Sequence, residues 1–166
     1  TPQGIVAVIQ KEEVGPPDFS QGKFLFLEDV QDPGNVGTMI RTADAAGLTG
    51  VIVSDKSADI YSLKTLRSMQ GSHFHLPIYR MPVATFIEEA KKSNLPILAT
   101  TLSRDSKDYR ELSPLENFAL VMGNEGQGIS PIMAESANQL VHIGMKGRAE
   151  SLNVAVAAGI LMFYFS

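Results

Sequence analysis

Three stretches rich in glycine and polar residues contain the side chains that could do chemistry. In "LEDVQDPGNVGTMIRTADAAG" (27–47), Gly37, Arg41 and Asp44 are spaced to share one flank of a helix, and Asn35 is placed to cap it. A glycine in a first helical turn is costly unless something approaches closely, so Arg41 is expected to project beside an opened space. Its guanidinium could then stabilise a developing oxyanion or hold a phosphate. An ordinary cap followed by a solvent-facing arginine explains the same residues equally well.

The second stretch, "FALVMGNEGQGIS" (118–130), takes an apolar strand into a glycine loop. A P-loop requires GxxxxGK[ST], but Ile129 occupies the lysine position. A dinucleotide fingerprint requires GxGxxG, and the order here is the reverse, with Gly123, Gly126 and Gly128. Both nucleotide interpretations are therefore weakened. What remains is a backbone loop that can approach a ligand closely, with Glu125 as its only charge, or simply a turn with left-handed glycines.

The third stretch, "HIGMKGRAESLNVAVAAG" (142–159), leads into the last helix. Ser151 is a natural N-cap, and the free amides of the following turn could hold a ligand. The helix beyond it is apolar nearly all round, with one stripe formed by Leu152, Val156, Gly159 and Phe163. A terminal helix of this kind is seldom buried within a small monomer, so part of it is expected to meet a second subunit. A fully internal helix is the alternative.

The elements that must position these stretches alternate between strand and helix. Short apolar runs, typical of strands covered on both faces, occur at 5–9, 24–27, 51–54, 76–79, 96–100 and 118–122. Helical patterns lie between them at 36–47, 83–92 and 130–137, the last opening with Ser130 as a possible N-cap. This alternation predicts an α/β fold with a mainly parallel sheet flanked by helices. Ligands of such sheets gather at the carboxyl ends of strands, where the loops enter the helices.

Composition limits the classes of protein that the chain can represent. Its 166 residues suggest one domain, and the absence of cysteine excludes disulfides, thiolate zinc sites and a cysteine nucleophile. That composition fits a reducing cytoplasm. The longest apolar stretch, 154–165, is too short to span a bilayer, so no membrane is expected as a partner. The net charge of −4 argues against a stand-alone, non-specific nucleic-acid binder.

The chain divides into a leading strand and linker (1–22) and a main domain (23–166). It opens with "TPQGIVAV" rather than a methionine, so a further domain upstream is expected. His73 and His75 have no carboxylate or thiol companion nearby in sequence, so they are expected to be strand-edge histidines and no metal is predicted. Candidate phosphate contacts, which a solvated surface explains nearly as well, are Lys64, Arg67, Lys146 and Arg148.

Taken together, the three stretches resemble the SpoU (TrmH-type) branch of the SPOUT RNA methyltransferases. The resemblance is carried by "NVGTMIRTA", "MGNEGQGIS" and "IGMKGRAESLNVAVAAG", in this order, and covers residues from about 24 to the end. One departure is Gly144, where the family usually has proline, and it could loosen the loop that cradles the cofactor.

The resemblance implies a C-terminal trefoil knot, which general topology rules would not predict. It also implies S-adenosylmethionine as cofactor, a homodimer with active sites at the interface, and methyl transfer to a ribose 2′-hydroxyl of rRNA or tRNA. Many members carry an N-terminal RNA-binding domain.

The same resemblance assigns functions to individual positions. The family's polar positions near the methyl-transfer centre correspond to Asn35, Arg41, Glu125, Ser151 and Asn153, with Glu125 able to pair with Arg41. Cofactor contacts are expected, largely through backbone groups, from Thr101, Leu102, Gly123, Gly126, Ile143, Met145 and Leu152.

Two alternatives to an enzyme of this kind stay open. The same scaffold could recognise RNA or a protein without catalysis, and Gly144 leaves some room for that. A nucleotide-dependent oxidoreductase is disfavoured by the reversed glycine order.

Overall fold

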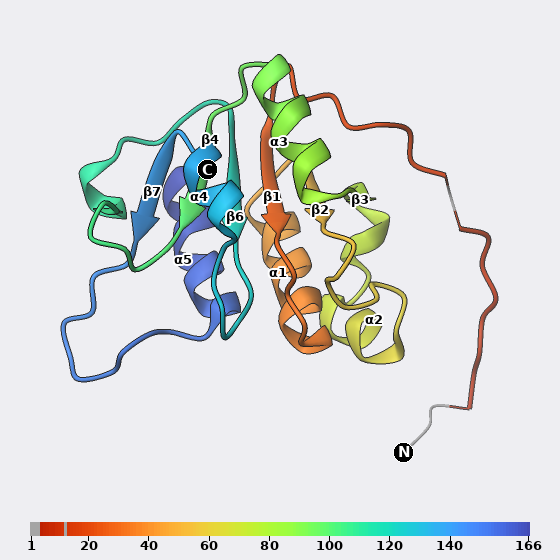
Figure 1. Cartoon of the computed structure of the whole chain (residues 1–166). Helices are drawn as coiled ribbons and strands as arrows, with labels where there is room; N and C mark the ends of the chain where they lie inside the picture. Colours follow the sequence, from red (N-terminus) through yellow and green to blue (C-terminus); the bar gives the residue numbers. More distant parts are fainter. Residues whose placement is uncertain (1–3, 12) are drawn as a thin grey trace.

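Seven short strands form one sheet in the order β3-β2-β1-β6-β4-β7-β5, and every strand pair is parallel. The computed structural model describes residues 4–11 and 13–166 (Figure 1). The strands are β1 (Lys23–Leu27), β2 (Gly50–Val53), β3 (Ile78–Arg80), β4 (Ile97–Thr100), β5 (Lys107–Asp108), β6 (Phe118–Met122) and β7 (Gln139–His142). The helices are α1 (Pro33–Ala45), α2 (Leu63–Met69), α3 (Val83–Lys92), α4 (Pro131–Ser136) and α5 (Val154–Phe165), with 3-10 turns η1 (Ser72–Phe74) and η2 (Tyr109–Glu111).

Five of the six predicted strands are confirmed, as are the helices predicted between them. The exception is 5–9, which forms no strand; its large apolar side chains are exposed, and the segment runs apart from the body of the protein (Figure 1). Two strands were not predicted. β5 is only two residues long, and "QLVH" of β7 has polar residues at both ends.

The sheet separates two apolar layers, which explains why its strands are apolar without alternation. Leu25 and Leu27 face a cluster built with α1, α2 and α5, whereas Phe24 and Phe26 face a second cluster built with α3 and α4. Phe26 stacks on Phe86 of α3 with ring centroids 4.1 Å apart. In the described part of the chain, no helix is both long and apolar enough to cross a membrane.

Helix α1 starts earlier than predicted and is covered on the side where a ligand space was expected. Its N-cap is Asp32, whose carboxylate accepts a hydrogen bond from the backbone N–H of Asn35. The prediction that Asn35 is the cap is therefore wrong. A Cβ added at Gly37 would lie 2.5 Å from Ser68 Cβ and 2.6 Å from the Thr65 carbonyl oxygen. Helix α2 therefore fills the gap at Gly37, and this glycine serves helix packing rather than an open space beside Arg41.

Helix α5 packs beside α1, and its N-cap is Asn153 rather than the predicted Ser151. The crossover 101–117 also contacts α5, because Tyr164 donates to the Leu112 carbonyl at 2.8 Å. The helix is not buried all round. Leu152, Val156 and Phe163 of the predicted stripe are exposed. Gly159 faces α1 instead, because a Cβ added there would lie 3.6 Å from Thr42 Cγ2.

Candidate functional site

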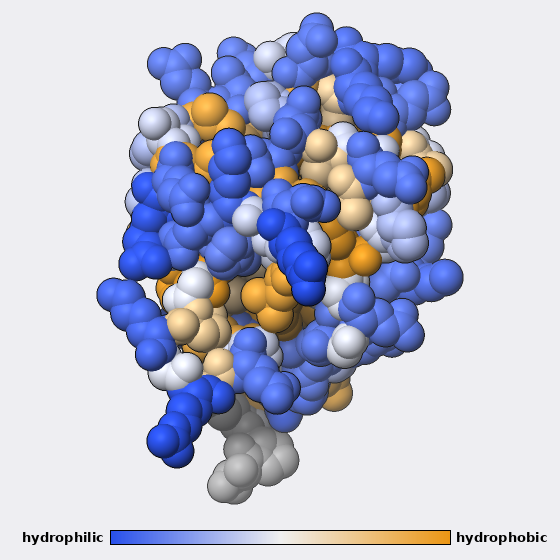
Figure 2. All heavy atoms as spheres, turned by 60° about the vertical axis from the view of Figure 1, so that its left-hand side comes forward, coloured by the Kyte–Doolittle hydropathy of each residue, from blue (hydrophilic) through white to orange (hydrophobic). Residues whose placement is uncertain are grey.

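A cavity of about 500 Å³ lies beyond the carboxyl ends of β4, β6 and β7. Apolar side chains such as Leu102, Met145 and Leu161 contribute to its lining. Figure 2 shows the face on which β7 lies, with apolar surface gathered in a hollow among polar side chains. All the positions predicted to contact a cofactor line this one cavity: Thr101, Leu102, Gly123, Gly126, Ile143, Met145 and Leu152. Glu125, Ser151 and Asn153 line it too.

The glycine loop 123–130 is folded tightly on itself. Asn124 and Gly128 exchange two backbone hydrogen bonds, of 2.9 and 3.0 Å, and the Asn124 side-chain oxygen accepts from the amides of Gly126 and Gln127. A Cβ at Gly123 would lie 2.3 Å from the Gly128 carbonyl carbon, so only glycine fits there. Within the loop, only Gly128 has a positive φ, of 71°, so left-handed glycines alone do not explain the motif.

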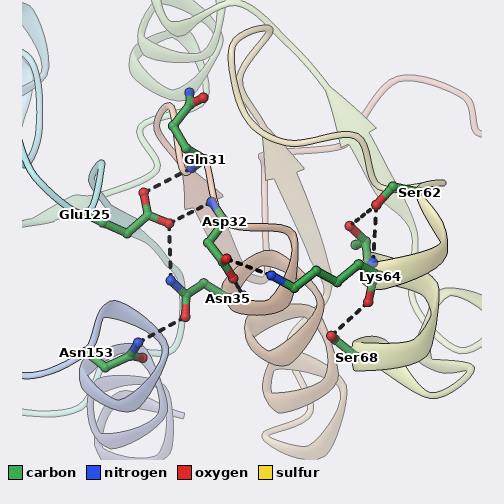
Figure 3. A network of polar contacts seen from close by, with 9 residues as sticks. Gln31, Asp32, Asn35, Ser62, Lys64, Ser68, Glu125 and Asn153 are labelled. Carbon is green, nitrogen blue, oxygen red and sulfur yellow. Dashed lines mark hydrogen bonds and ion pairs between the residues drawn. The ribbon is translucent and has the colours of Figure 1, made fainter.

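Glu125 joins the glycine loop to the start of α1. Its carboxylate accepts from the amides of Gln31 and Asp32 at 3.0 Å each and from Asn35 Nδ2 at 3.2 Å (Figure 3). Burial opposes ionisation of Glu125, but these hydrogen bonds outweigh it and lower its pKa. Among the described residues, no ion pair joins Glu125 to Arg41, so the suggested pairing does not occur within one chain. The carboxylate instead accepts from free backbone amides at the N-terminus of α1.

A relay of side-chain amides continues from Glu125 to α5. Asn35 Oδ1 accepts from Asn153 Nδ2 at 3.1 Å (Figure 3). Asn153 Oδ1 accepts from the backbone amides of Ala155 and Val156 at 2.8 and 3.2 Å. An ionised carboxylate can only accept, so Asn35 must turn its Nδ2 towards Glu125 and its oxygen towards Asn153. One polar network thereby fixes three stretches that are far apart in the sequence.

Two further carboxylates hold the loops around the cavity, and both were missed in the sequence. Glu28 follows β1, is 2% exposed, and accepts from the Ser130 amide at 3.1 Å. Burial raises the pKa of Glu28, against the hydrogen bonds from Ser130. Asp108 ends β5 and accepts from the Gly144 amide at 3.1 Å. Glu28 lies at the start of the first stretch and Asp108 lies outside all three, and their roles depend on strand pairing that composition does not reveal.

Arg41 is exposed on α1 and does not line the cavity. It lies six residues beyond Asn35, which corresponds to about 9 Å along the helix axis. The other basic candidates differ in their surroundings. All four are exposed, and Lys64 also pairs with Asp32 at 3.0 Å; the other three are Arg67, Lys146 and Arg148.

The histidines are not at a strand edge as predicted. His73 lies in η1 with its ring 4.0 Å from that of Phe74, and His75 Nδ1 lies 2.8 Å from Asp44 Oδ2. Burial lowers the pKa of His73.

Comparisons with known proteins place this geometry in context. The sequence model of the SpoU rRNA Methylase family matches residues 22–163. The chain is 44% identical to the 23S rRNA (guanosine(2553)-2′-O)-methyltransferase RlmP of Bacillus subtilis, over 99% of the chain. An AdoMet-bound rRNA methyltransferase from Sinorhizobium meliloti superposes with a TM-score of 0.82 at 41% identity over 86% of the chain. The SpoU methyltransferase AviRb from Streptomyces viridochromogenes, in complex with AdoMet, gives a TM-score of 0.76 at 34% identity over 90% of the chain.

The chain is shorter than each of these proteins. It spans 65% of the Bacillus subtilis protein, 54% of the Sinorhizobium meliloti protein and 60% of AviRb.

Proposed function

Because the chain belongs to the SpoU rRNA methylase family, we propose that it transfers a methyl group from S-adenosylmethionine to a ribose 2′-hydroxyl group of RNA. The observation that carries the proposal is the single cavity lined by all seven expected cofactor positions, with the Glu125–Asn35–Asn153 relay beside it. The names of the relatives make rRNA the first substrate to test, with tRNA as the second.

The residues around the cavity fit S-adenosylmethionine. A volume of about 500 Å³ lies within the range of roughly 300–1,000 Å³ that small-molecule sites occupy. Leu102, Ile143 and Met145 give the lining apolar surface for an adenine ring and a thioether. Gly123, Gly126 and Gly128 of the glycine loop line the cavity without side chains, so the loop backbone can approach a ligand closely. When bound, the cofactor supplies a methyl group on a sulfonium, whose leaving group needs no proton.

The protein's own residues must therefore orient the ribose and manage its weakly acidic hydroxyl proton. We assign Arg41 an electrostatic role, because a guanidinium keeps its proton in proteins. It would stabilise the developing alkoxide or hold the adjacent phosphate. Asn35 and Asn153 would orient substrate groups through the amide positions that the relay leaves free, and Ser151 would contact the substrate at the cavity mouth.

A homodimer is part of the proposal. The exposed side chains of Val156 and Phe163 on α5, and of Leu152 just before it, form an apolar stripe next to α1, which carries Arg41. A second copy packed on this stripe would bury it and bring Arg41 of one chain towards the cavity of the other. This arrangement would also account for the distance of Arg41 from its own relay.

The trefoil knot is also proposed. Helix α5 contacts β6 and α1, and it also contacts the crossover 101–117: Tyr164 donates to Leu112, and its ring centroid lies 4.9 Å from that of Tyr109. The contact of the C-terminal helix with this crossover supports a chain that passes through the loop formed there.

We further propose that residues 1–22 connect the methyltransferase domain (23–166) to an upstream RNA-binding domain and that the protein acts in the cytoplasm on cellular RNA. The greater length of the relatives supports the first point.

The test is methylation of purified rRNA with isotope-labelled S-adenosylmethionine, followed by mass spectrometry of nucleosides for the 2′-O-methyl group. We expect Arg41→Ala to lower kcat at least about 100-fold, the scale of removing one transition-state stabiliser, and to leave the Kd for S-adenosylmethionine unchanged. Lys91→Ala, which removes an exposed cation from α3 on the opposite face of the sheet, should leave kcat within about threefold. Cofactor binding without transfer by the wild type would favour a non-catalytic module, and equal losses of binding and turnover would make Arg41 structural.

A further inference from the structure

Gly144 lies between two residues, Ile143 and Met145, that line the candidate cofactor cavity. Its amide donates to Asp108 Oδ2 at 3.1 Å. Over residues 144–151, all of them described, this is the one hydrogen bond to the rest of the protein, and residues 146–151 are exposed. Between β7 and Asn153, the hydrogen bond that restrains this loop is therefore the one from a neighbouring strand.

The strand pairing sets Asp108 opposite the base of the loop. Asp108 pairs in register with His142, the last residue of β7, so its side chain can reach the amide two residues further along. The space between them is filled. A Cβ added at Gly144 would lie 2.6 Å from Asp108 Oδ2, closer than real Cβ atoms come to any neighbour. Gly144 thus combines a free N–H with the lack of a side chain, and the contact requires both.

The Asp108 carboxylate is held in place by Arg110. Arg110 Nε donates to Oδ1 at 2.7 Å and Nη2 to Oδ2 at 2.8 Å, a bidentate pair that leaves the carboxylate little freedom to rotate. The Asp108 side chain is 13% exposed, against 50% for Arg110. Hydrogen bonds from Arg110 hold the pKa of Asp108 far below its usual range, so the acceptor is ionised at neutral pH.

This segment is in turn anchored to α5. Tyr164 donates to the Leu112 carbonyl at 2.8 Å, and the Tyr109 and Tyr164 rings meet edge to face. The carboxylate is therefore fixed relative to the helix that forms another wall of the cavity. A fixed acceptor orders a loop that has few other contacts.

We propose that Asp108 is a positioning residue that holds the loop around Gly144 in the conformation that binds the cofactor. The loop is held by the hydrogen bond from the Gly144 N–H to the Asp108 carboxylate, which Arg110 keeps in place. The inference rests on the proposed function, since it concerns the site for S-adenosylmethionine, but the tether itself concerns only the chain's own residues.

A double-mutant cycle tests the contact. We expect Asp108→Ala to raise the Kd for S-adenosylmethionine, measured by calorimetry, about tenfold, the scale of one lost charge-assisted hydrogen bond. The kcat at saturating cofactor should stay within about threefold, because the substrate groups are untouched. Gly144→Ala should weaken binding to a similar degree in the wild type and should have little further effect when Asp108 is already alanine. Glu111→Ala removes an exposed carboxylate three residues away and serves as the matched control, with unchanged Kd.

A second readout needs no cofactor. In the free protein, Asp108→Ala should speed amide hydrogen exchange in the peptide that contains Gly144 and leave exchange in α3 unchanged. If the wild type binds S-adenosylmethionine and Asp108→Ala binds equally well with unaltered exchange, the positioning role is refuted while the proposed function stands. Additive effects of Asp108→Ala and Gly144→Ala would likewise refute it. If the wild type binds no S-adenosylmethionine, both the function and the role of Asp108 at a cofactor site are overturned.

Discussion

Two loops border the candidate cofactor cavity, and they are held in different ways. Loop 123–130, after β6, is braced internally by Asn124 and externally by Glu125, and it is joined at its far end to Glu28. Loop 143–153, after β7, is held at Gly144 and at Asn153 and is exposed between them. The difference indicates that the first loop is a preformed wall, whereas the second is restrained mainly near its two ends.

The strongest test of the preformed wall is Gly123→Ala. The new methyl group would lie 2.3 Å from the backbone of Gly128, and backbone cannot move aside as a flexible side chain could. We expect the free energy of unfolding to fall by about 3 kcal/mol, at the upper end of overpacking effects, together with loss of cofactor binding. Urea denaturation and calorimetric titration would measure the two effects.

Gly126→Ala is the matched control in the same loop. Its Cβ would meet only Asn124 Oδ1, at an ordinary 3.7 Å, and its φ is not positive. The free energy of unfolding should change by less than about 0.5 kcal/mol. Similar destabilisation by the two substitutions would mean that the loop is not held by close backbone packing.

A smaller effect is expected where the second loop ends. Asn153→Ala removes the acceptor for two α5 amides and the donor to Asn35, so the free energy of unfolding should fall by about 1 kcal/mol. Ser151→Ala should cost almost nothing in stability, because Ser151 makes no cap. Thermal and urea unfolding of both variants provide the measurement. The opposite ranking would restore Ser151 as the cap.

The sequence predicted the fold well where a signal is local. Buried strands such as "FALVM" are short apolar runs between turn residues, and α3 has a clear amphipathic period, so both were found within one or two residues. The strand predicted at 5–9 was wrong because apolar composition does not show whether a neighbouring strand is available. β5 was missed because two residues carry no periodic signal.

The residues of the candidate site were predicted, but the hydrogen bonds between them were not. The predicted cofactor positions gather at one cavity, since the carboxyl ends of parallel strands meet at one edge. The partners of Asn35, Glu125 and Asn153 were not predictable, because they depend on where a helix begins. Shifting the N-cap of α1 from Asn35 to Asp32 frees the Asn35 side chain to join the relay.

The smallest effect is expected at the two carboxylates that hold loop 123–130, Glu125 and Glu28. The pKa of Glu125 is lowered, so the folded state binds fewer protons there than the unfolded state does. Its contribution to stability is present above the ordinary value of 4.5 and is lost as the pH falls through the lowered folded value. Burial raises the pKa of Glu28, so its contribution has the opposite sign and stability falls as the pH rises from 4.5 through the raised value.

Replacing each carboxylate by its amide separates the two cases. In Glu125→Gln, the side-chain NH2 must face a backbone N–H of Gln31 or Asp32, so one hydrogen bond is lost. At neutral pH the free energy of unfolding should fall by about 0.5 kcal/mol, a small value because the site is exposed to solvent. In Glu28→Gln, the amide oxygen can still accept from Ser130 without burying a charge, so the variant should be as stable as the wild type or more so. Unfolding measured from about pH 3 to pH 7 should therefore show the two variants diverging from the wild type in opposite directions as the pH rises. Parallel pH profiles of the two variants would contradict this prediction. They would mean that the same balance of burial and hydrogen bonding acts on Glu28 and on Glu125.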